Sequence, residues 1–191
     1  SDAYNSHSAP LAPRQCNYTW QCLSRLPPLL ACLALVLSGT SLNAQDAARE
    51  WIDEHLDETV QLYQYFHRNP ELSFHEEQTA ARLTEELQQA GCDVVTGVGG
   101  HGVVGLLENG EGPTIMWRCD LDALPVTEAT GLEYASTVRT KNDDGVEVGV
   151  MHACGHDIHI TNLVAAARFV STHRDLWQGT LMFVGQPAEE R

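Results

Sequence analysis

Residues 113–125 read PTIMWRCDLDALP, an apolar run that ends in two aspartates. A short apolar run bounded by turn residues is typical of a buried β-strand. Similar runs occur at 92–98 (CDVVTGV), 102–108 (GVVGLLE) and 180–185 (TLMFVG), so the sequence predicts a sheet built from these strands. The stretch 124–148 is less regular, and its KNDDG segment predicts a turn.

Helical patterns alternate with these strands. Apolar residues recur near helical spacing between 46 and 66, and Asn69–Pro70 ends that pattern. A second helix is expected over 75–90, with Gly91 at its C-terminal end, and a third over 157–172. Because helices and strands alternate, we expect an α/β domain whose sheet is covered on both faces.

The composition limits the classes of function. A chain of 191 residues with 43% hydrophobic residues is long and apolar enough to build one domain with a real core. The formal net charge of −15 argues against a nucleic-acid partner, since binding phosphates needs a basic face. Acidity of this kind is usually a property of a well-solvated surface, so it says little about the substrate.

Residues 1–44 are expected to be a leader that contains a signal peptide. The run LLACLALVL at 29–37 is too short to span a bilayer, which takes roughly 20 apolar residues. Arg25 precedes it and the small-residue exit SGTSLNA follows it, so cleavage is expected near Ala44. The alternative is a buried helix of the domain. The leader predicts an exported protein, periplasmic or secreted, with no stable membrane anchor, and leaves 45–191 as the domain.

The six cysteines do not suggest a disulfide framework. Removing the leader removes three of them, and an odd number of widely spaced cysteines remains. The remaining three are Cys92, Cys119 and Cys154. At least one thiol is therefore free for other chemistry.

The segment MHACGHDIHI at 151–160 is the richest in metal-binding side chains. Thiolate and imidazole are the preferred ligands of zinc and related ions, and Cys154 and His156 can converge from a tight turn around Gly155. His156 and His159 would share a face once a helix has begun. A single histidine is more often part of a core, but three histidines and a cysteine together predict a metal or catalytic site.

Two further polar groups follow predicted strands. Asp120 and Asp122 lie at the carboxyl end of a strand, where α/β domains bind ligands, and we expect one of the two to face the site. Glu189 and Glu190 end the segment GQPAEE, and adjacent carboxylates allow one to bind a metal while the other acts as a general base. Taken alone, either pair could be a solvated polar turn.

Together these segments resemble the metal-dependent aminoacylase and carboxypeptidase-like amidohydrolases, notably hippurate hydrolases and hydrolases of indole-acetyl amino acid conjugates. HRNPELSFHEEQTA at 67–80 and GVMHACGHD at 149–157 carry the resemblance further, and it covers roughly 46–191. It implies a three-layer α/β/α di-metal peptidase-like catalytic domain, with a smaller domain inserted after residue 191. We therefore expect this chain to be an incomplete N-terminal part of that domain, truncated before the smaller domain.

The resemblance also assigns roles to single residues. It implies that Cys154, His156 and Glu190 are metal ligands and that Glu189 is the general base. Asp120 matches a catalytic-site carboxylate that supports the metals. The implied cofactors are two divalent ions, zinc or manganese, with cobalt or nickel as alternatives.

One position departs from the broader family. Arg118 stands where other branches have a histidine ligand, and the Cys–Gly–His turn supplies ligands instead. Two further histidine ligands are expected beyond residue 191, so the site is not complete within this chain.

The function implied is hydrolysis of an amide bond in N-acyl amino acids, aryl-acyl amino acid conjugates or small peptides. Alternatives are an N-acetyl-diaminopimelate-type deacetylase, a metal-binding fragment without catalysis, and an enzyme with Cys154 as nucleophile. A homodimer of the full-length protein is compatible with the resemblance.

Overall fold

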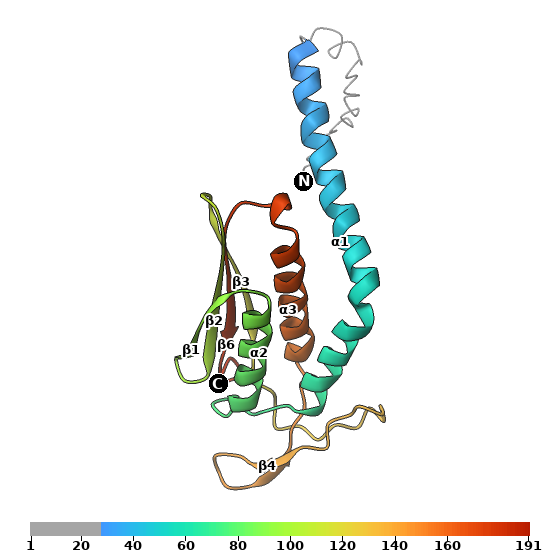
Figure 1. Cartoon of the computed structure of the whole chain (residues 1–191). Helices are drawn as coiled ribbons and strands as arrows, with labels where there is room; N and C mark the ends of the chain where they lie inside the picture. Colours follow the sequence, from blue (N-terminus) through green and yellow to red (C-terminus); the bar gives the residue numbers. More distant parts are fainter. Residues whose placement is uncertain (1–27) are drawn as a thin grey trace, which may run out of the picture. The chain divides into compact units, whose positions relative to one another are not determined.

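The computed structural model describes the backbone of residues 28–191 and the side chains of residues 44–191 (Figure 1). The chain divides into the units Ser1–Asn43 and Ala44–Arg191, and the second holds the sheet. Apart from the backbone of helix α1 (Pro28–Arg68), the predicted leader lies outside the described residues. None of the helices described here has the length and apolar character needed to cross a bilayer.

The order of elements follows the sequence patterns closely. After α1 come α2 (Glu77–Gln89), β1 (Asp93–Val98), β2 (Gly102–Asn109), β3 (Thr114–Asp120), β4 (Arg139–Lys141), β5 (Glu147–Gly149), α3 (His156–Thr172), the 3-10 helix η2 (Arg174–Leu176) and β6 (Gly179–Gln186). All three predicted helices and four predicted strands are confirmed. Gly91 follows α2 with a φ of 82°, the left-handed conformation expected after a helix.

The main sheet has the strand order β1-β2-β6-β3 (Figure 1). β2 is antiparallel to both β1 and β6, whereas β3 is parallel to β6, and α3 lies in the connection between that parallel pair. Asp120 pairs with Gln186, so the carboxyl ends of β3 and β6 meet at one edge of the sheet. The α/β class is confirmed, and this edge brings distant polar segments together.

The core lies between the sheet and the helices. α2 packs on β1 and β2, α3 packs on β3 and β6, and the two helices contact each other. Large side chains from the helices and the sheet are fully buried in one cluster, which includes Phe66, Leu83, Leu87, Leu107, Leu163 and Phe183. Replacing such a leucine by alanine typically costs about 2–5 kcal/mol of stability.

The helices of residues 44–191 share that single cluster, so they cover one face of the sheet. Side chains alternate along a strand, and Val104 and Leu106 therefore point away from the face that buries Val103 and Leu107. A helical layer on this second face, which the alternation of elements predicted, is not among the described residues. β3 forms the edge of the sheet, and its central side chains are exposed.

The segment predicted to be irregular contains a small second sheet. β4 and β5 pair antiparallel around a turn in which the Asn142 side chain accepts a hydrogen bond from the Val146 N–H. The KNDDG turn is confirmed. The two strands escaped prediction because three residues are too few to show a period.

Candidate metal and catalytic site

The candidate site lies where β3, β6 and α3 meet. The Leu121 N–H donates to the carbonyl oxygen of Gln186 at 2.9 Å, which ties the two strand ends together. α3 begins at His156, directly after Gly155 in the left-handed conformation (φ 78°). The predicted tight turn at Cys–Gly–His is therefore present, and it delivers His156 to the edge of the sheet.

Three predicted residues gather at this edge. Asp120, His156 and Glu189 each offer one ligand atom, and these atoms all lie within 4.8 Å of one another. His156 Nε2 is 3.8 Å from Glu189 Oε2 and 3.9 Å from Glu190 Oε1. The buried His156 ring thus faces both carboxylates of the predicted pair.

The other ring nitrogen of His156 is already engaged. Its Nδ1 lies 2.8 Å from the carbonyl oxygen of Asp122, and a carbonyl only accepts hydrogen bonds. The proton must therefore be on Nδ1 in the neutral ring, which leaves the lone pair of Nε2 directed at the carboxylates. A histidine that binds a metal usually donates its second N–H in this way.

Both aspartates, not one, lie at the site. Asp122 is fully buried, and its Oδ2 accepts hydrogen bonds from Ser73 Oγ at 2.6 Å and from the Glu190 N–H at 2.9 Å. The prediction that only one aspartate faces the site was wrong, since side chains two positions apart in an extended chain share a side. Asp120 is paired with Arg118 Nη2 at 2.8 Å, although the geometry is that of an ion pair rather than a directed hydrogen bond.

Cys154 lies outside the group of three. Its thiol is exposed, and the neighbouring Glu190 carboxylate, which can accept a hydrogen bond from it, raises the pKa of the thiol. A bound cation would reverse that effect, because a coordinating thiol is deprotonated. The structure therefore places Cys154 beside Glu190, while Glu189 is the carboxylate grouped with Asp120 and His156.

A buried charge network that the sequence did not reveal supports α3. His67, from the last turn of α1, places Nδ1 2.7 Å from Asp157 Oδ2 and Nε2 3.1 Å from Glu128 Oε1. Burial lowers the pKa of His67, but the hydrogen bonds to Asp157 and Glu128 outweigh it, so the pKa is raised overall. The only sequence signal was that His67 and Asp157 both belong to segments that carry the family resemblance.

His152 lies close by but takes no part in the group. Both ring nitrogens are buried and find no hydrogen-bond partner among the described residues. Burial lowers the pKa of His152 to about 4, so the ring is neutral at pH 7.

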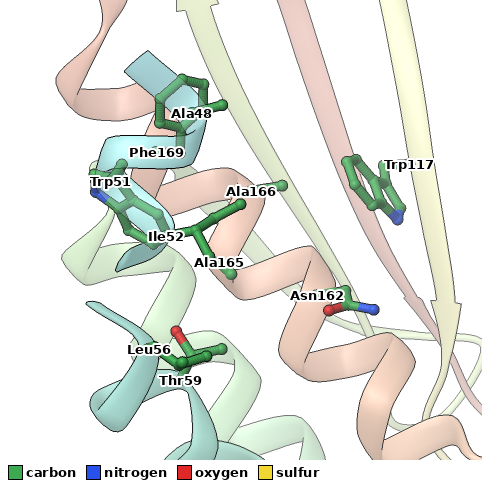
Figure 2. Close-up of a pocket in the computed structure, with 10 residues that line it drawn as sticks. All are labelled: Ala48, Trp51, Ile52, Leu56, Thr59, Trp117, Asn162, Ala165, Ala166 and Phe169. Atoms are coloured by element: carbon green, nitrogen blue, oxygen red, sulfur yellow. The ribbon is translucent and has the colours of Figure 1, made fainter. Parts of the chain in front are cut away.

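A separate groove of about 420 Å³ lies between α1, α3 and β3 (Figure 2). Figure 2 shows Trp51, Ile52 and Phe169 on the helices facing it and Trp117 across from them on the sheet. None of the residues that line the groove is titratable, so the groove is not a second candidate for the catalytic site.

The donors at the sheet edge fit a divalent ion. Imidazole, carboxylate and thiol are the groups that bind zinc, and carboxylates also suit manganese. The free Nε2 of His156, directed at Glu189 and Glu190, is the observation that supports this fit.

Comparison with known proteins agrees with this geometry. Residues 116–191, which contain all of the candidate donors, match the family described as Peptidase family M20/M25/M40. Over this segment the chain is similar to that family. The resemblance to amidohydrolases of the aminoacylase and carboxypeptidase type is confirmed.

Two relatives belong to the predicted subgroups. The IAA-amino acid hydrolase ILR1-like 5 of Arabidopsis thaliana is 35% identical over 162 residues, which cover 85% of this chain and 35% of that protein. The hippurate hydrolase of Campylobacter jejuni is 41% identical over 125 residues, which cover 65% of this chain and 30% of that protein. The chain thus spans about a third of the length of these relatives.

A solved structure from Bacillus subtilis has the same fold over the matched part. It is described as a dinuclear metal-binding peptidase from the M20 family, is 33% identical and superposes with a TM-score of 0.62. The match covers 70% of this chain and 35% of that chain.

Proposed function

We propose that the protein to which this chain belongs hydrolyses an amide bond in N-acyl amino acids, aryl-acyl amino acid conjugates or small peptides. The observation that carries the proposal is the grouping of Asp120, His156 and Glu189 within 4.8 Å, with Glu190 beside them. The names of the relatives, a hippurate hydrolase and an IAA-amino acid hydrolase, support acyl amino acids as the substrate class.

The proposed site residues have two roles, as metal ligands and as a general base. His156, Glu190 and Cys154 would hold two divalent ions, zinc or manganese. When bound, the ions polarise the scissile carbonyl and lower the pKa of water towards ~7. Asp120, at the end of β3, supports these metal ligands.

Glu189 is the proposed general base. Its side chain is 40% exposed, against 21% for Glu190, so it is the carboxylate that an incoming substrate and water can reach. Glu189 takes a proton from the attacking water and hands it to the leaving amine. The backbone N–H of Glu190 donates a hydrogen bond to Asp122 Oδ2, and this bond fixes the position of Glu190.

The test is an assay of the full-length protein on three substrates: N-benzoylglycine, indole-3-acetyl-alanine and N-acetyl-diaminopimelate. We expect turnover of one of the first two, loss of turnover with a chelator, and recovery when zinc or manganese is restored. Turnover of N-acetyl-diaminopimelate alone would favour the biosynthetic deacetylase instead. Tight metal binding without turnover of any of the three would contradict hydrolysis.

We also propose that the protein is exported. The support is the leader pattern at 29–37 and its small-residue exit. The N-terminus of the exported protein should lie close to Gln45, and an active cytosolic enzyme that keeps the leader would contradict export.

A further inference from the structure

Two residues other than glycine have positive φ angles in the described part of the chain. They are Phe74, at 67°, and Ala188, at 52°. This left-handed conformation is unfavourable for any residue with a Cβ atom, and it persists only where the surroundings hold it in place. Ala188 directly precedes the proposed base Glu189, so the cause of its conformation bears on the site.

One carboxylate oxygen is bonded to both of these residues. Glu76 Oε1 accepts a hydrogen bond from the Phe74 N–H at 2.9 Å and another from the Ala188 N–H at 2.8 Å. Glu76 is fully buried, and its Oε2 finds no hydrogen-bond partner among the described residues. The hydrogen bonds of this carboxylate therefore go to the two left-handed residues.

The Glu76 side chain does not cap α2, the helix that it directly precedes. It occupies the position before α2, yet its carboxylate makes no capping hydrogen bond. The free N–H groups of the first turn, those of Gln78 and Thr79, donate instead to Glu71 at 3.1 and 2.8 Å. The buried carboxyl group of Glu76 therefore does not stabilise the helix start by capping.

The loop after β6 is fixed on both sides of Glu189. The Ala188 N–H is bonded to Glu76, and the Glu190 N–H is bonded to Asp122 Oδ2 at 2.9 Å. Two buried carboxylates thus hold alternate amides of the loop, while the Glu189 side chain between them is exposed.

We propose that Glu76 is a positioning residue that holds Ala188 in the left-handed conformation and thereby directs Glu189 toward His156. The role of Glu189 rests on the proposed function, whereas the effect of Glu76 on the loop does not. Without the acceptor, Ala188 would relax to a negative φ and turn the following carboxylate away. A glycine at 188 would keep the turn without help, because it has no Cβ atom.

The first test is amide hydrogen exchange in the full 191-residue chain. Glu76→Ala should speed exchange at Phe74 and Ala188 about tenfold or more, since a hydrogen bond to a charged group is lost. Glu77→Ala, the matched control at an exposed neighbour, should leave both amides unchanged. If Glu76→Ala fails to fold, Glu76→Gln against Glu77→Gln should show the same contrast at about threefold, since a neutral acceptor is weaker. Equal effects of the two positions would overturn the proposal.

The second test is rescue. In the Glu76→Ala variant, the amide exchange rate at Glu190 should also rise. Adding Ala188→Gly to this variant should return that rate to within about threefold of the rate in the unmodified chain. In the full-length enzyme, kcat should fall about tenfold with Glu76→Ala and recover with the added glycine, with little change in KM. A purely structural role of Glu76 predicts no rescue, and absence of rescue would contradict the proposal. If the enzyme hydrolyses no amide at all, the proposed function fails, while the exchange data still decide the role of Glu76.

Discussion

His156 Nδ1 lies 2.8 Å from the carbonyl oxygen of Asp122, and this hydrogen bond leaves Nε2 as the only ring nitrogen free to bind a metal. His159 provides a matched control, because it lies one turn further along α3 and is exposed. We predict that His156→Ala lowers the zinc affinity of the full-length protein at least about tenfold, since even the loss of a residue that only hydrogen-bonds to a metal ligand costs ~10–100-fold. His159→Ala should leave the affinity within about twofold. Competition with a fluorescent zinc chelator measures both, and equal affinities of the two variants would exclude His156 as a ligand.

The His67 network predicts a pH dependence of stability. The pKa of His67 is raised in the folded chain, because its hydrogen bonds to Asp157 and Glu128 outweigh the effect of burial. The folded state therefore holds this proton more tightly than the unfolded state, whose histidine titrates at about 6.5. The resulting stabilisation is complete below about pH 6.5 and is lost as the pH rises through the folded pKa.

Urea unfolding of the parent and of His67→Gln from about pH 5.5 to about pH 9 checks this. The difference in free energy of unfolding between the two should shrink as the pH rises. A difference that is flat, or that grows with pH, would show that His67 does not gain a proton on folding.

The three cysteines whose side chains the structure describes are all free, yet they should differ in reactivity. Burial raises the pKa of Cys92 to about 11, and it raises the pKa of Cys119 further still, so both should resist alkylation in the folded chain. Cys154 is exposed, but the neighbouring Glu190 carboxylate raises its pKa, which slows the reaction. Glu190→Gln should therefore speed iodoacetamide labelling of Cys154 several-fold, by about 2–10 times near pH 8. Peptide mapping by mass spectrometry would detect this, and slower labelling in the variant would contradict the contact.

The edge strand β3 predicts self-association of this chain. Ile115, Met116 and Trp117 are 58%, 62% and 48% exposed on a strand that has one hydrogen-bonded neighbour, β6, within the described part of the chain. An exposed apolar edge is a template for pairing with another chain, and a lysine on it opposes such pairing. We predict that Met116→Lys reduces association measured by analytical ultracentrifugation, whereas Gln61→Lys on the exposed side of α1 does not. Equal association of both variants would show that β3 is not the contact.

Local patterns predicted most of the fold but little of the network around the site. The helices and long strands show a clear period over six or more residues, whereas β4 and β5 are too short to show one. The bonds from His67 to Asp157 and from Glu76 to Ala188 join residues far apart in sequence, and no local spacing encodes them.

The site residues themselves could be predicted because each follows a strand or a turn with a recognisable motif. Asp120, His156 and Glu189 were all expected at the site from the sequence, and their ligand atoms lie within 4.8 Å of one another. Only one of Asp120 and Asp122 was expected to face it. The left-handed conformation of Ala188 could not be foreseen, since turn rules lead to glycine and asparagine at such positions.

The central claim is that Glu189 is the general base of an amide-hydrolysing site, and Glu189→Gln tests it most directly. Glutamine keeps the size of the side chain but cannot accept the proton, so kcat of the full-length enzyme should fall ~100- to 10,000-fold. Zinc content and KM should stay close to those of the parent, whereas Glu190→Gln should lose metal as well as rate. A Glu189→Gln enzyme that keeps more than about half of its kcat would contradict the assignment.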